Sequence, residues 1–572
     1  MKVTRIWLAA ILLLGLFLRF WGIQFGLPHP LTRPDEEFFV NSALLPLDHF
    51  RPYDYVYPSL LRYILFFLYG LYFCIGKITG TFKTLYDFAM LYAVDRSAFY
   101  LIARALSAIL GTACVYALFR LAKRFLSQST ALVSAFFLSV AYLHVRNSHF
   151  GVSDVVMTFF VVVAVTAIVA LYQAKTLRSY CIAGIWAGLA FSIKYPAFVL
   201  VITGYCAHVM NVWPSIRKRP TVLVDKKIIL FFILFALTFF LGTPFALIDC
   251  RHFLHGSIAA VRVTSVLGGT YPASAPVLGW WYQLIFTLRY GLGGTLFIAS
   301  LIGIFLFLRR DWRLAVIVLS FPVLNFLVFG SSFIVMSRYM VPLVPFLCLT
   351  AGITIEWLTS RIAYPWRPWQ PLFVIGAAGA VAFVPLVNSA QVCSLLAKTD
   401  TRILAASWFE QNAPAGSSVA QLIINYYARL ELRPSEEYLR HRLEKLEHTA
   451  FLTGFPKLRI KYLLDHIRKT KWRGFNEWDY DFKTRQFKLG LVPQAGFPDY
   501  IAVIDEELPP EEQALLRKQY RLVTKFASAA YDDPGRKEDI WDVFFIPYVG
   551  FRGIVRPGPT ISIYGRKQGN AR

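Results

Sequence analysis

Three adjacent carboxylates follow directly on an apolar run that is long enough to cross a bilayer. Asp35, Glu36 and Glu37 stand in the stretch LPHPLTRPDEEFFVNS (27–42), which follows TRIWLAAILLLGLFLRFWGIQFG. A solvated loop has no need of acids between an Arg-Pro pair and a hydrophobic patch. A carboxylate held at a membrane surface can instead take the proton from an attacking hydroxyl group. Asp35 is the candidate base, Glu36 a candidate for orienting the attacking molecule, and Glu37 an expected surface residue.

Cations and a phenol stand near the ends of other apolar runs. Arg104 lies one turn into a run, Lys194 lies between AGLAFSI and YPAFVL, and Arg338 occupies a short polar break beside Tyr339. Guanidinium and ammonium groups bind phosphate well. Other interpretations stay open: Arg104 could snorkel to the interface, Arg338 could anchor its helix, and an internal Asp could pair with Lys194.

The stretch RNSHFGVSD (146–154) adds Arg146, His149 and Asp154 to the candidates, and Tyr57 is a further one. Asp154 could simply cap the following helix together with the preceding serine. The ten histidines are scattered, and neither HxxxH nor CxxC occurs. No metal cofactor is therefore required, although an acid pair could hold one divalent ion.

The composition indicates a polytopic α-helical membrane protein. Hydrophobic residues make up 56% of the 572 residues, charged residues only 16%, and the mean hydropathy is +0.51. A soluble domain has about a quarter charged residues. The net charge of +25 does not point to nucleic acid, because the Lys and Arg residues mostly flank apolar runs, where they set topology and meet lipid phosphates.

About eleven transmembrane helices are expected. Their ranges are 5–23, 97–119, 131–147, 153–172, 180–193, 195–211, 228–247, 290–308, 314–330, 340–358 and 371–390. The first span is interpreted as an uncleaved signal anchor with a cytoplasmic N-terminus. The eleven spans then put every cluster of Lys and Arg between them on the cytoplasmic side. A further span at 60–76 would reverse this sidedness. That segment is therefore interpreted as a juxtamembrane or re-entrant helix at the outer surface.

This topology divides the chain into two domains and gathers the candidate residues outside the cytoplasm. Residues 1–390 form the membrane domain, with 24–96 as its first outer loop. Residues 391–572 form an outer α/β domain, in which 400–414 has helical spacing. The stretches SSVAQLII, DYIAVID, YRLVTKFAS and TISIYGR are typical of strands.

In the order and common side of its motifs, the chain resembles the GT-C glycosyltransferases. Among them it resembles the protein O-mannosyltransferases and lipid A aminoarabinose transferases (family 39-like). The resemblance covers the membrane part. It is carried by RPDEEFF (33–39), YPSLLRYI (57–64), RALSAILGTACVYALFRLAKRF (104–125), VRNSHFGVSDVVMTFF (145–160), AGIWAGLAFSIKYPAF (183–198), LGTPFALID (241–249) and SRYMVPLVPF (337–346). The family often has His-Pro-Pro-Leu where this chain has Tyr57-Pro58-Ser59-Leu60, a departure that leaves the role of Tyr57 open.

The resemblance implies a GT-C fold and transfer of a sugar from a polyprenyl-phosphate donor to a glycan, lipid or protein acceptor. It places the enzyme in the bacterial inner membrane, with its site on the periplasmic side. The family's Asp-Glu pair maps onto Asp35-Glu36, with Asp35 as base. The competing interpretation is a transporter or flippase of an anionic lipid, which would be expected to show repeat symmetry. A non-enzymatic scaffold would leave the acid pair unexplained.

Overall fold

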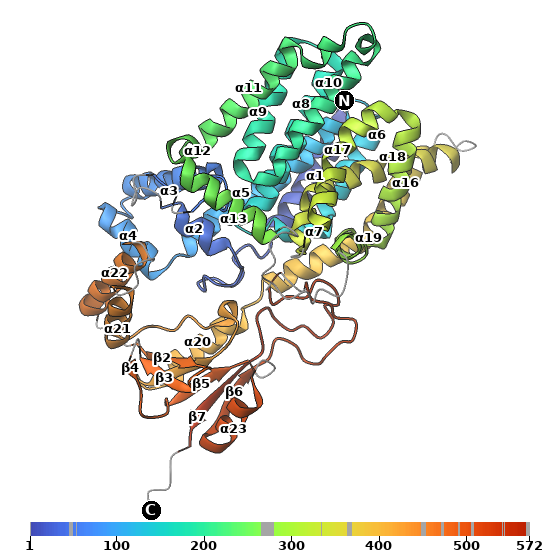
Figure 1. The fold of residues 1–572 in the computed structure, drawn as a ribbon. Coiled ribbons are helices and arrows are strands. Elements are labelled where there is room, and N and C mark those ends of the chain that lie inside the picture. Colours follow the sequence, from blue (N-terminus) through green and yellow to red (C-terminus); the bar gives the residue numbers. More distant parts are fainter. Residues whose placement is uncertain are drawn as a thin grey trace, which may run out of the picture.

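The structure is a computed structural model, and two parts make up the molecule: a helical bundle and a C-terminal α/β domain (Figure 1). It describes residues 2–44, 50–52, 54–264, 279–332, 335–362, 369–447, 454–470, 474–489, 492–504, 508–539, 542 and 544–567. The membrane protein with a C-terminal sheet domain that the sequence predicts is confirmed.

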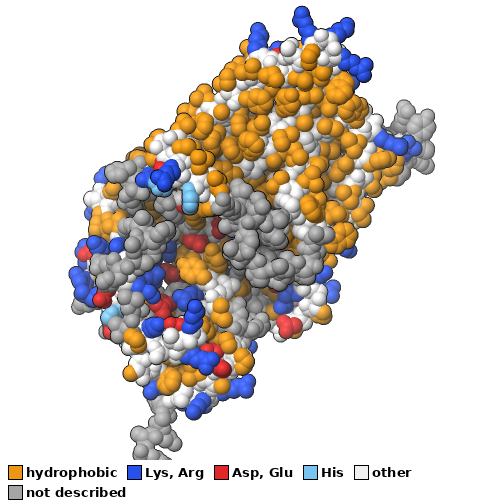
Figure 2. All heavy atoms as spheres, viewed as in Figure 1, with side chains coloured by type: hydrophobic (Ala, Val, Ile, Leu, Met, Phe, Trp, Pro, Cys, Tyr) orange, Lys and Arg blue, Asp and Glu red, His pale blue; other side chains and the backbone are white. Residues whose placement is uncertain are grey.

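Each expected span coincides with a helix of the bundle. These helices are α1 (Lys2–Phe20), α5 (Ser97–Ala122), α6 (Gln128–Val140), α8 (Ser153–Ala174), α9 (Leu177–Ile193), α10 (Leu200–Ile216), α11 (Lys226–Gly242), α16 (Gly294–Arg310), α17 (Trp312–Gly330), α18 (Val344–Ile362) and α19 (Gln370–Leu396). Leu and Phe cover the outward faces, so Figure 2 shows a broad apolar belt around the bundle. Such a surface requires lipid as its solvent.

By length and hydropathy, fewer helices qualify as membrane spans than the eleven expected. Within the described residues, eight helices qualify: seven of the expected spans and α3 (Leu60–Ile78). A ninth is added if the bent pair Gly279–Leu292 and Gly294–Arg310 is one span. Helices α6, α9 and α11 fall short because they have 13, 17 and 17 residues. Helix α6 continues into α7 (Tyr142–Asn147) beyond a break at Ala141. Together α6 and α7 rise about 30 Å at 1.5 Å per residue, enough for a hydrocarbon core.

Helix α3 (Leu60–Ile78) also meets the length criterion, although the sequence predicts a surface helix there. Figure 1 shows α3 beside α4 (Leu85–Val94) and α2 (Glu36–Ser42), at the end of the bundle that faces the C-terminal domain and that also carries α13 (Cys250–Thr264). The same end carries α12 (Phe245–Ile248). The surface position of α3 stays a prediction.

The basic clusters meet at the opposite end of the bundle. Lys227 donates to the carbonyl of Lys175 at 2.9 Å, so the turns before α9 and α11 lie together. Arg124 donates to Gln173 at 3.3 Å and joins the end of α5 to the end of α8. Figure 2 shows Lys and Arg side chains at this end, beyond the apolar belt. The arrangement agrees with the sidedness inferred from the positive-inside rule.

The C-terminal domain is built on a mixed sheet with strand order β4-β3-β2-β1-β5-β7-β6. β1 pairs in parallel with β2 and β5, and the other neighbours pair antiparallel. The strands are β1 (Ser418–Leu422), β2 (Asn476–Asp481), β3 (Gln486–Leu489), β4 (Val492–Pro493), β5 (Tyr500–Val503), β6 (Tyr520–Phe526) and β7 (Ile561–Arg566). The domain's helices are α20 (Thr401–Asn412), α21 (Glu436–Glu447), α22 (Gly454–Thr470) and α23 (Pro510–Gln519). The four predicted strands and the helix after Asp400 are confirmed.

Between β6 and β7 the chain returns to the bundle. Phe544, Ile546 and Tyr548 are buried in the core of the membrane domain rather than in that of the sheet. Tyr548 donates to the carbonyl of Thr287 at 2.9 Å. This segment, residues 535–558, is called the return segment below. It fixes the α/β domain against the end of the bundle opposite the basic clusters, beside the candidate residues.

Candidate active site

Asp35 lies at the start of α2, in the loop that leaves α1. Its backbone has φ 70° and ψ −14°, a left-handed conformation that is uncommon for a residue other than glycine. The carboxylate accepts from Arg338 at 2.5 Å. Arg338 belongs to the 3₁₀ helix η6 (Ser337–Leu343), which leads into α18. The fold therefore brings together two predicted site residues that are 303 positions apart.

Asp35 is ionised in this setting. Burial raises its pKa, but the charge and hydrogen bond of Arg338 outweigh burial, with smaller effects from Arg33 and Lys194, and the net pKa is lowered. The side chain keeps 29% of its surface exposed, against 8% for Arg338. Asp35 is thus a partly accessible carboxylate in the form that can accept a proton.

Lys194 and Asp154 form a second ion pair beside the first. Lys194 caps α9 and donates to Asp154, in the first turn of α8, at 2.7 Å. Of the two partners predicted for Lys194, a phosphate or an internal Asp, the structure shows the Asp. The ammonium lies 5.8 Å from the ring centre of Tyr57 and 5.9 Å from that of Tyr339. Five predicted residues therefore surround Asp35: Arg338, Lys194, Asp154, Tyr57 and Tyr339.

Glu36 and Arg104 form a separate, fully buried pair beneath this group. Arg104 donates through Nε and Nη2 to the Glu36 carboxylate, at 3.0 and 2.7 Å, and through Nη1 to two carbonyls of the chain leaving α1. The backbone N–H of Gly151 donates to Glu36 at 2.7 Å. A side chain at Gly151 would meet Ala103 at 2.9 Å, so only glycine allows this approach. The Arg104 guanidinium, a predicted phosphate-binding group, is therefore engaged by groups of the protein itself.

His149 and Arg146 lie apart from Asp35. The His149 ring nitrogens are 3.0 and 3.1 Å from the carbonyls of Val145 and Trp21, so the ring ties α7 to α1. Arg146 is buried, with its guanidinium 5.2 Å from the ring centres of both Phe544 and Tyr548. It therefore holds the return segment.

Sequence reasoning missed Arg33, Asp539 and Asp542. Arg33 is buried and forms an ion pair with Asp542 of the return segment. Asp539 accepts from the backbone N–H of Ser337 at 3.0 Å and so fixes the residue before Arg338. Burial raises the pKa of Asp542, but the charges of Arg33, Arg338 and Arg146 outweigh it and the net pKa is lowered. The available signal was KEDIWDVFF, in which three acids stand among large apolar residues.

The third carboxylate of the opening motif, Glu37, behaves differently from Asp35. Burial, then the charges of Asp35 and Glu36, raise its pKa to about 7. The folded state therefore holds a proton that the unfolded chain loses above its ordinary value of 4.5. Stability linked to Glu37 is present at low pH and is lost as the pH rises from about 4.5 through about 7.

A Glu37→Gln variant should therefore gain melting temperature at pH 8 relative to wild type, and gain less or nothing at pH 5. Thermal unfolding of the purified protein in detergent at the two pH values measures this. The exposed Glu511→Gln, whose partner is an arginine (Arg485) rather than a histidine, is the control and should shift both melting temperatures alike. An equal effect of Glu37→Gln at both pH values would contradict the assignment.

Within the described ranges, no three His, Cys, Asp or Glu side chains are grouped as metal ligands. Asp35 and Glu36 each have a basic partner instead. Figure 2 shows acidic side chains in the recess between the bundle and the C-terminal domain.

Comparison with known proteins supports the fold. Residues 67–242 match the model of the dolichyl-phosphate-mannose-protein mannosyltransferase family. No curated protein sequence matches the chain. ArnT from Cupriavidus metallidurans in the apo state is similar over 98% of this chain and 97% of its own, with a TM-score of 0.51 and 11% identity. The structure of the same protein bound to undecaprenyl phosphate is similar over 98% of this chain and 98% of its own, with a TM-score of 0.50 and 11% identity.

The Archaeoglobus fulgidus oligosaccharyltransferase in its apo form has a TM-score of 0.48 and 13% identity, over 73% of this chain. This chain spans only 62% of that enzyme's length. The resemblance found in the sequence is confirmed by the family match and the ArnT similarity: the chain has the GT-C fold, and residues 67–242 carry the dolichyl-phosphate-mannose-protein mannosyltransferase pattern.

Proposed function

We propose that this protein is a membrane glycosyltransferase that moves a sugar from a polyprenyl-phosphate carrier to an acceptor hydroxyl or phosphate. The observation that carries the proposal is the ionised, partly exposed Asp35 held by Arg338 at the outer end of an apolar bundle. The family match and the similarity to an ArnT structure bound to undecaprenyl phosphate support a lipid-linked donor. We place the site and the C-terminal domain on the periplasmic side of a bacterial inner membrane.

The chemistry needs one proton acceptor and one stabilised leaving group. For a hydroxyl acceptor, the oxygen bonds to the anomeric carbon of the donor while its proton passes to Asp35. The bond between the anomeric carbon and the phosphate oxygen breaks, and its electrons stay on the phosphate. Arginine stabilises the charge that develops there. Asp35 and Arg338 share a hydrogen bond, so a phosphate that engages Arg338 also frees the Asp35 carboxylate.

The other residues take roles that follow from their contacts. Lys194 supplies a second positive charge near Tyr57 and Tyr339, and Asp154 holds it in place. Glu36 and Arg104 position the loop that carries Asp35, because their pair joins that loop to α5 and to Gly151. We therefore assign the phosphate to Arg338 and Lys194, and a positioning role to Arg104.

The decisive experiment uses purified protein in liposomes and a polyprenyl phosphate carrying one radiolabelled sugar. The donors form a library whose members differ in the sugar. Cleavage of the sugar–phosphate bond, followed by appearance of label on an acceptor or in water, supports the proposal. Movement of the intact donor between leaflets without cleavage would instead identify a lipid transporter.

Replacing Arg338 by alanine should lower kcat/KM for the donor by about 10²-fold, because the leaving phosphate loses its main hydrogen-bonding cation. Arg338→Lys keeps the charge without the planar fork and should fall between alanine and wild type. Initial rates over a range of donor concentrations measure both. Arg51→Ala, which removes an exposed outer pair with Asp249, should change the rates less than two-fold. Equal losses for Arg51→Ala and Arg338→Ala would refute the assignment.

A further inference from the structure

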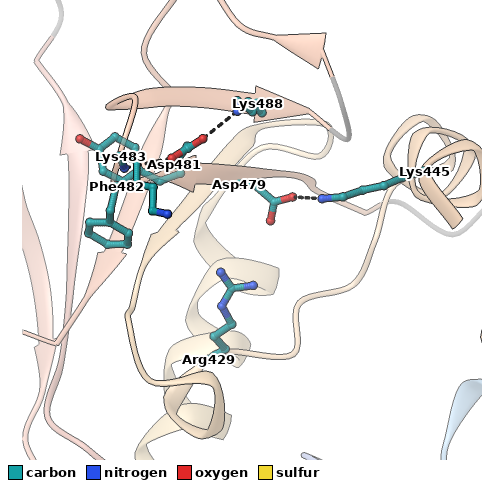
Figure 3. Close-up of a pocket in the computed structure, with 8 residues that line it drawn as sticks. Arg429, Lys445, Asp479, Asp481, Phe482, Lys483 and Lys488 are labelled. Atoms are coloured by element: carbon teal, nitrogen blue, oxygen red, sulfur yellow. Dashed lines mark hydrogen bonds and ion pairs between the residues drawn. The ribbon is translucent and has the colours of Figure 1, made fainter. Parts of the chain in front are cut away.

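The C-terminal domain holds a pocket away from the Asp35 group. It has a volume of about 430 Å³, within the range of small-ligand sites, and it opens to solvent. Its lining comes from β2, β3, the turn between them, α21 and the segment before Leu430; the residues are Arg429, Lys445, Asp479, Tyr480, Asp481, Phe482, Lys483 and Lys488. Figure 3 shows these side chains arranged around one space.

The pocket carries an excess of positive charge that the described protein does not balance. Lys445 pairs with Asp479 at 3.2 Å and Lys488 pairs with Asp481 at 2.8 Å, so both acids are already engaged. Figure 3 shows the Arg429 guanidinium pointing toward β2 without such a pair. Within the described residues, the side chains of Arg429 and Lys483 have no hydrogen-bond partner. Two cations therefore remain available to a ligand.

A nearby acid does not cancel this charge. Glu477 lies two residues before Asp479 on the same face of β2 and accepts from Gln421 at 2.8 Å. Burial raises its pKa to about 7 against the charges of Arg442 and Arg429, so Glu477 is only partly ionised at neutral pH. Among the described residues no hydrogen bond or ion pair joins Arg429 to Glu477, so the Arg429 guanidinium can still bind an anion through its planar fork.

Two half-buried aromatic residues also line the pocket. Tyr480 and Phe482 pack edge to face with ring centres 5.0 Å apart, and both line the pocket. The apolar face of a sugar ring packs on such rings, while an anionic substituent meets Arg429. Aromatic and cationic groups together favour a charged saccharide over an apolar ligand or a bare ion.

The pocket is connected to the candidate active site through the backbone. The carbonyl of Arg429 accepts from His29 Nε2 at 2.6 Å, and His29 lies six positions before Asp35. Two residues earlier, the charges of Glu37 and Asp35 act on the Tyr427 phenol and, with burial as the largest cause, raise its pKa. The segment 427–429, whose first two residues belong to the 3₁₀ helix η8 (Tyr426–Ala428), therefore connects the neighbourhood of the carboxylates to the pocket.

We infer that this pocket binds an anionic saccharide, a sugar bearing a phosphate or a carboxylate, as the distal part of the acceptor. The inference rests on the proposed function, because it names the acceptor class of that reaction. Arg429 and Lys483 bind the anionic group, and Tyr480 and Phe482 pack on the ring. The acceptor's hydroxyl then extends past Tyr427 toward Asp35.

Binding is tested without donor, so the result does not depend on catalysis. Full-length protein in nanodiscs is titrated with mannose 6-phosphate, trigalacturonate or unmodified mannose, and binding is followed by saturation-transfer NMR. At least one anionic sugar should bind, and mannose should bind at least ten-fold more weakly. In the Arg429→Ala/Lys483→Ala variant, the affinity for the anionic sugar should fall by about ten-fold or more. Selective binding of mannose 6-phosphate would identify phosphate as the anionic group that the pocket binds. Selective binding of trigalacturonate would identify a carboxylate.

The control is Arg521→Ala, which removes an exposed cation from β6, at the other edge of the sheet. It should leave affinity unchanged, and all variants should keep the wild-type melting temperature. The inference is overturned if no anionic sugar binds wild type, if mannose binds equally well, or if Arg521→Ala weakens binding as much as the double variant. Failure of donor cleavage would instead overturn the proposed function and leave these binding results standing.

Discussion

Replacing Asp35 by asparagine is expected to lower the rate of sugar transfer by about 10²- to 10⁴-fold, the range that a positioned general base contributes. The amide has nearly the same size as the carboxylate and can still accept a hydrogen bond from Arg338, but it cannot take a proton. Protein abundance and melting temperature should stay close to those of wild type, because Asp35 keeps 29% of its surface in solvent.

The matched control for this variant is Asp54→Asn. Asp54 lies in the same outer loop and also accepts from an arginine, Arg62, at 3.1 Å. Its loss should change transfer less than a few-fold. Single-turnover transfer of radiolabelled sugar, with donor in excess of its dissociation constant, measures both variants. Transfer by Asp35→Asn within two-fold of wild type would remove Asp35 as the base.

The pH dependence of wild type gives an independent check. Because the pKa of Asp35 is lowered, the carboxylate stays ionised down through its ordinary range near 3.8. Protonation of the base should therefore not limit the rate between pH 5 and 8. A rate that rises steeply over this interval would point to a group with a pKa near 7, and Glu37 is the neighbouring carboxylate of that kind.

The apolar runs and basic clusters predicted the bundle because lipid imposes a strong, local rule on every span. They did not reveal how α6 and α7 share one crossing, since a break at Ala141 depends on packing rather than on hydropathy. Strand β2 was missed for a similar reason. Its sequence NEWDYD carries three acids and an asparagine around only two aromatic residues, and its place in the sheet is set by pairing with β1 and β3.

The candidate site was predictable as a set of residues but not as a set of pairs. Sidedness alone placed Asp35, Arg338 and Lys194 on one face, and the structure brings them together. Partner choice needs tertiary contacts: Lys194 meets Asp154, 40 positions away, and Arg338 meets Asp35, 303 positions away. The return segment was not predicted, because its turns are typical of a surface loop, whereas Phe544 and Tyr548 are buried in the bundle.

Breaking the buried pair of Glu36 and Arg104 should destabilise the protein far more than breaking an exposed ion pair. Both side chains are fully buried, so Arg104→Met leaves the Glu36 carboxylate without its cation in a setting where desolvation is costly. The expected cost is about 3–5 kcal/mol. It should appear as a large fall in melting temperature and in the yield of monodisperse protein. The exposed pair of Arg310 and Glu356 gives the control, with Arg310→Met costing less than about 1 kcal/mol.

A double-mutant cycle separates this loss of a partner from a loss of packing. Glu36→Gln combined with Arg104→Met removes both charges, so the penalty for an unpaired buried ion disappears and the double variant should be more stable than Arg104→Met alone. The amide side chain that Glu36→Gln introduces can still accept from the Gly151 N–H, which keeps the contact between the outer loop and the start of α8. Additive losses in the cycle would show that the two side chains act independently. A recovered fold with low transfer would show that the pair also positions Asp35, since the loop carrying the base would then be held less firmly.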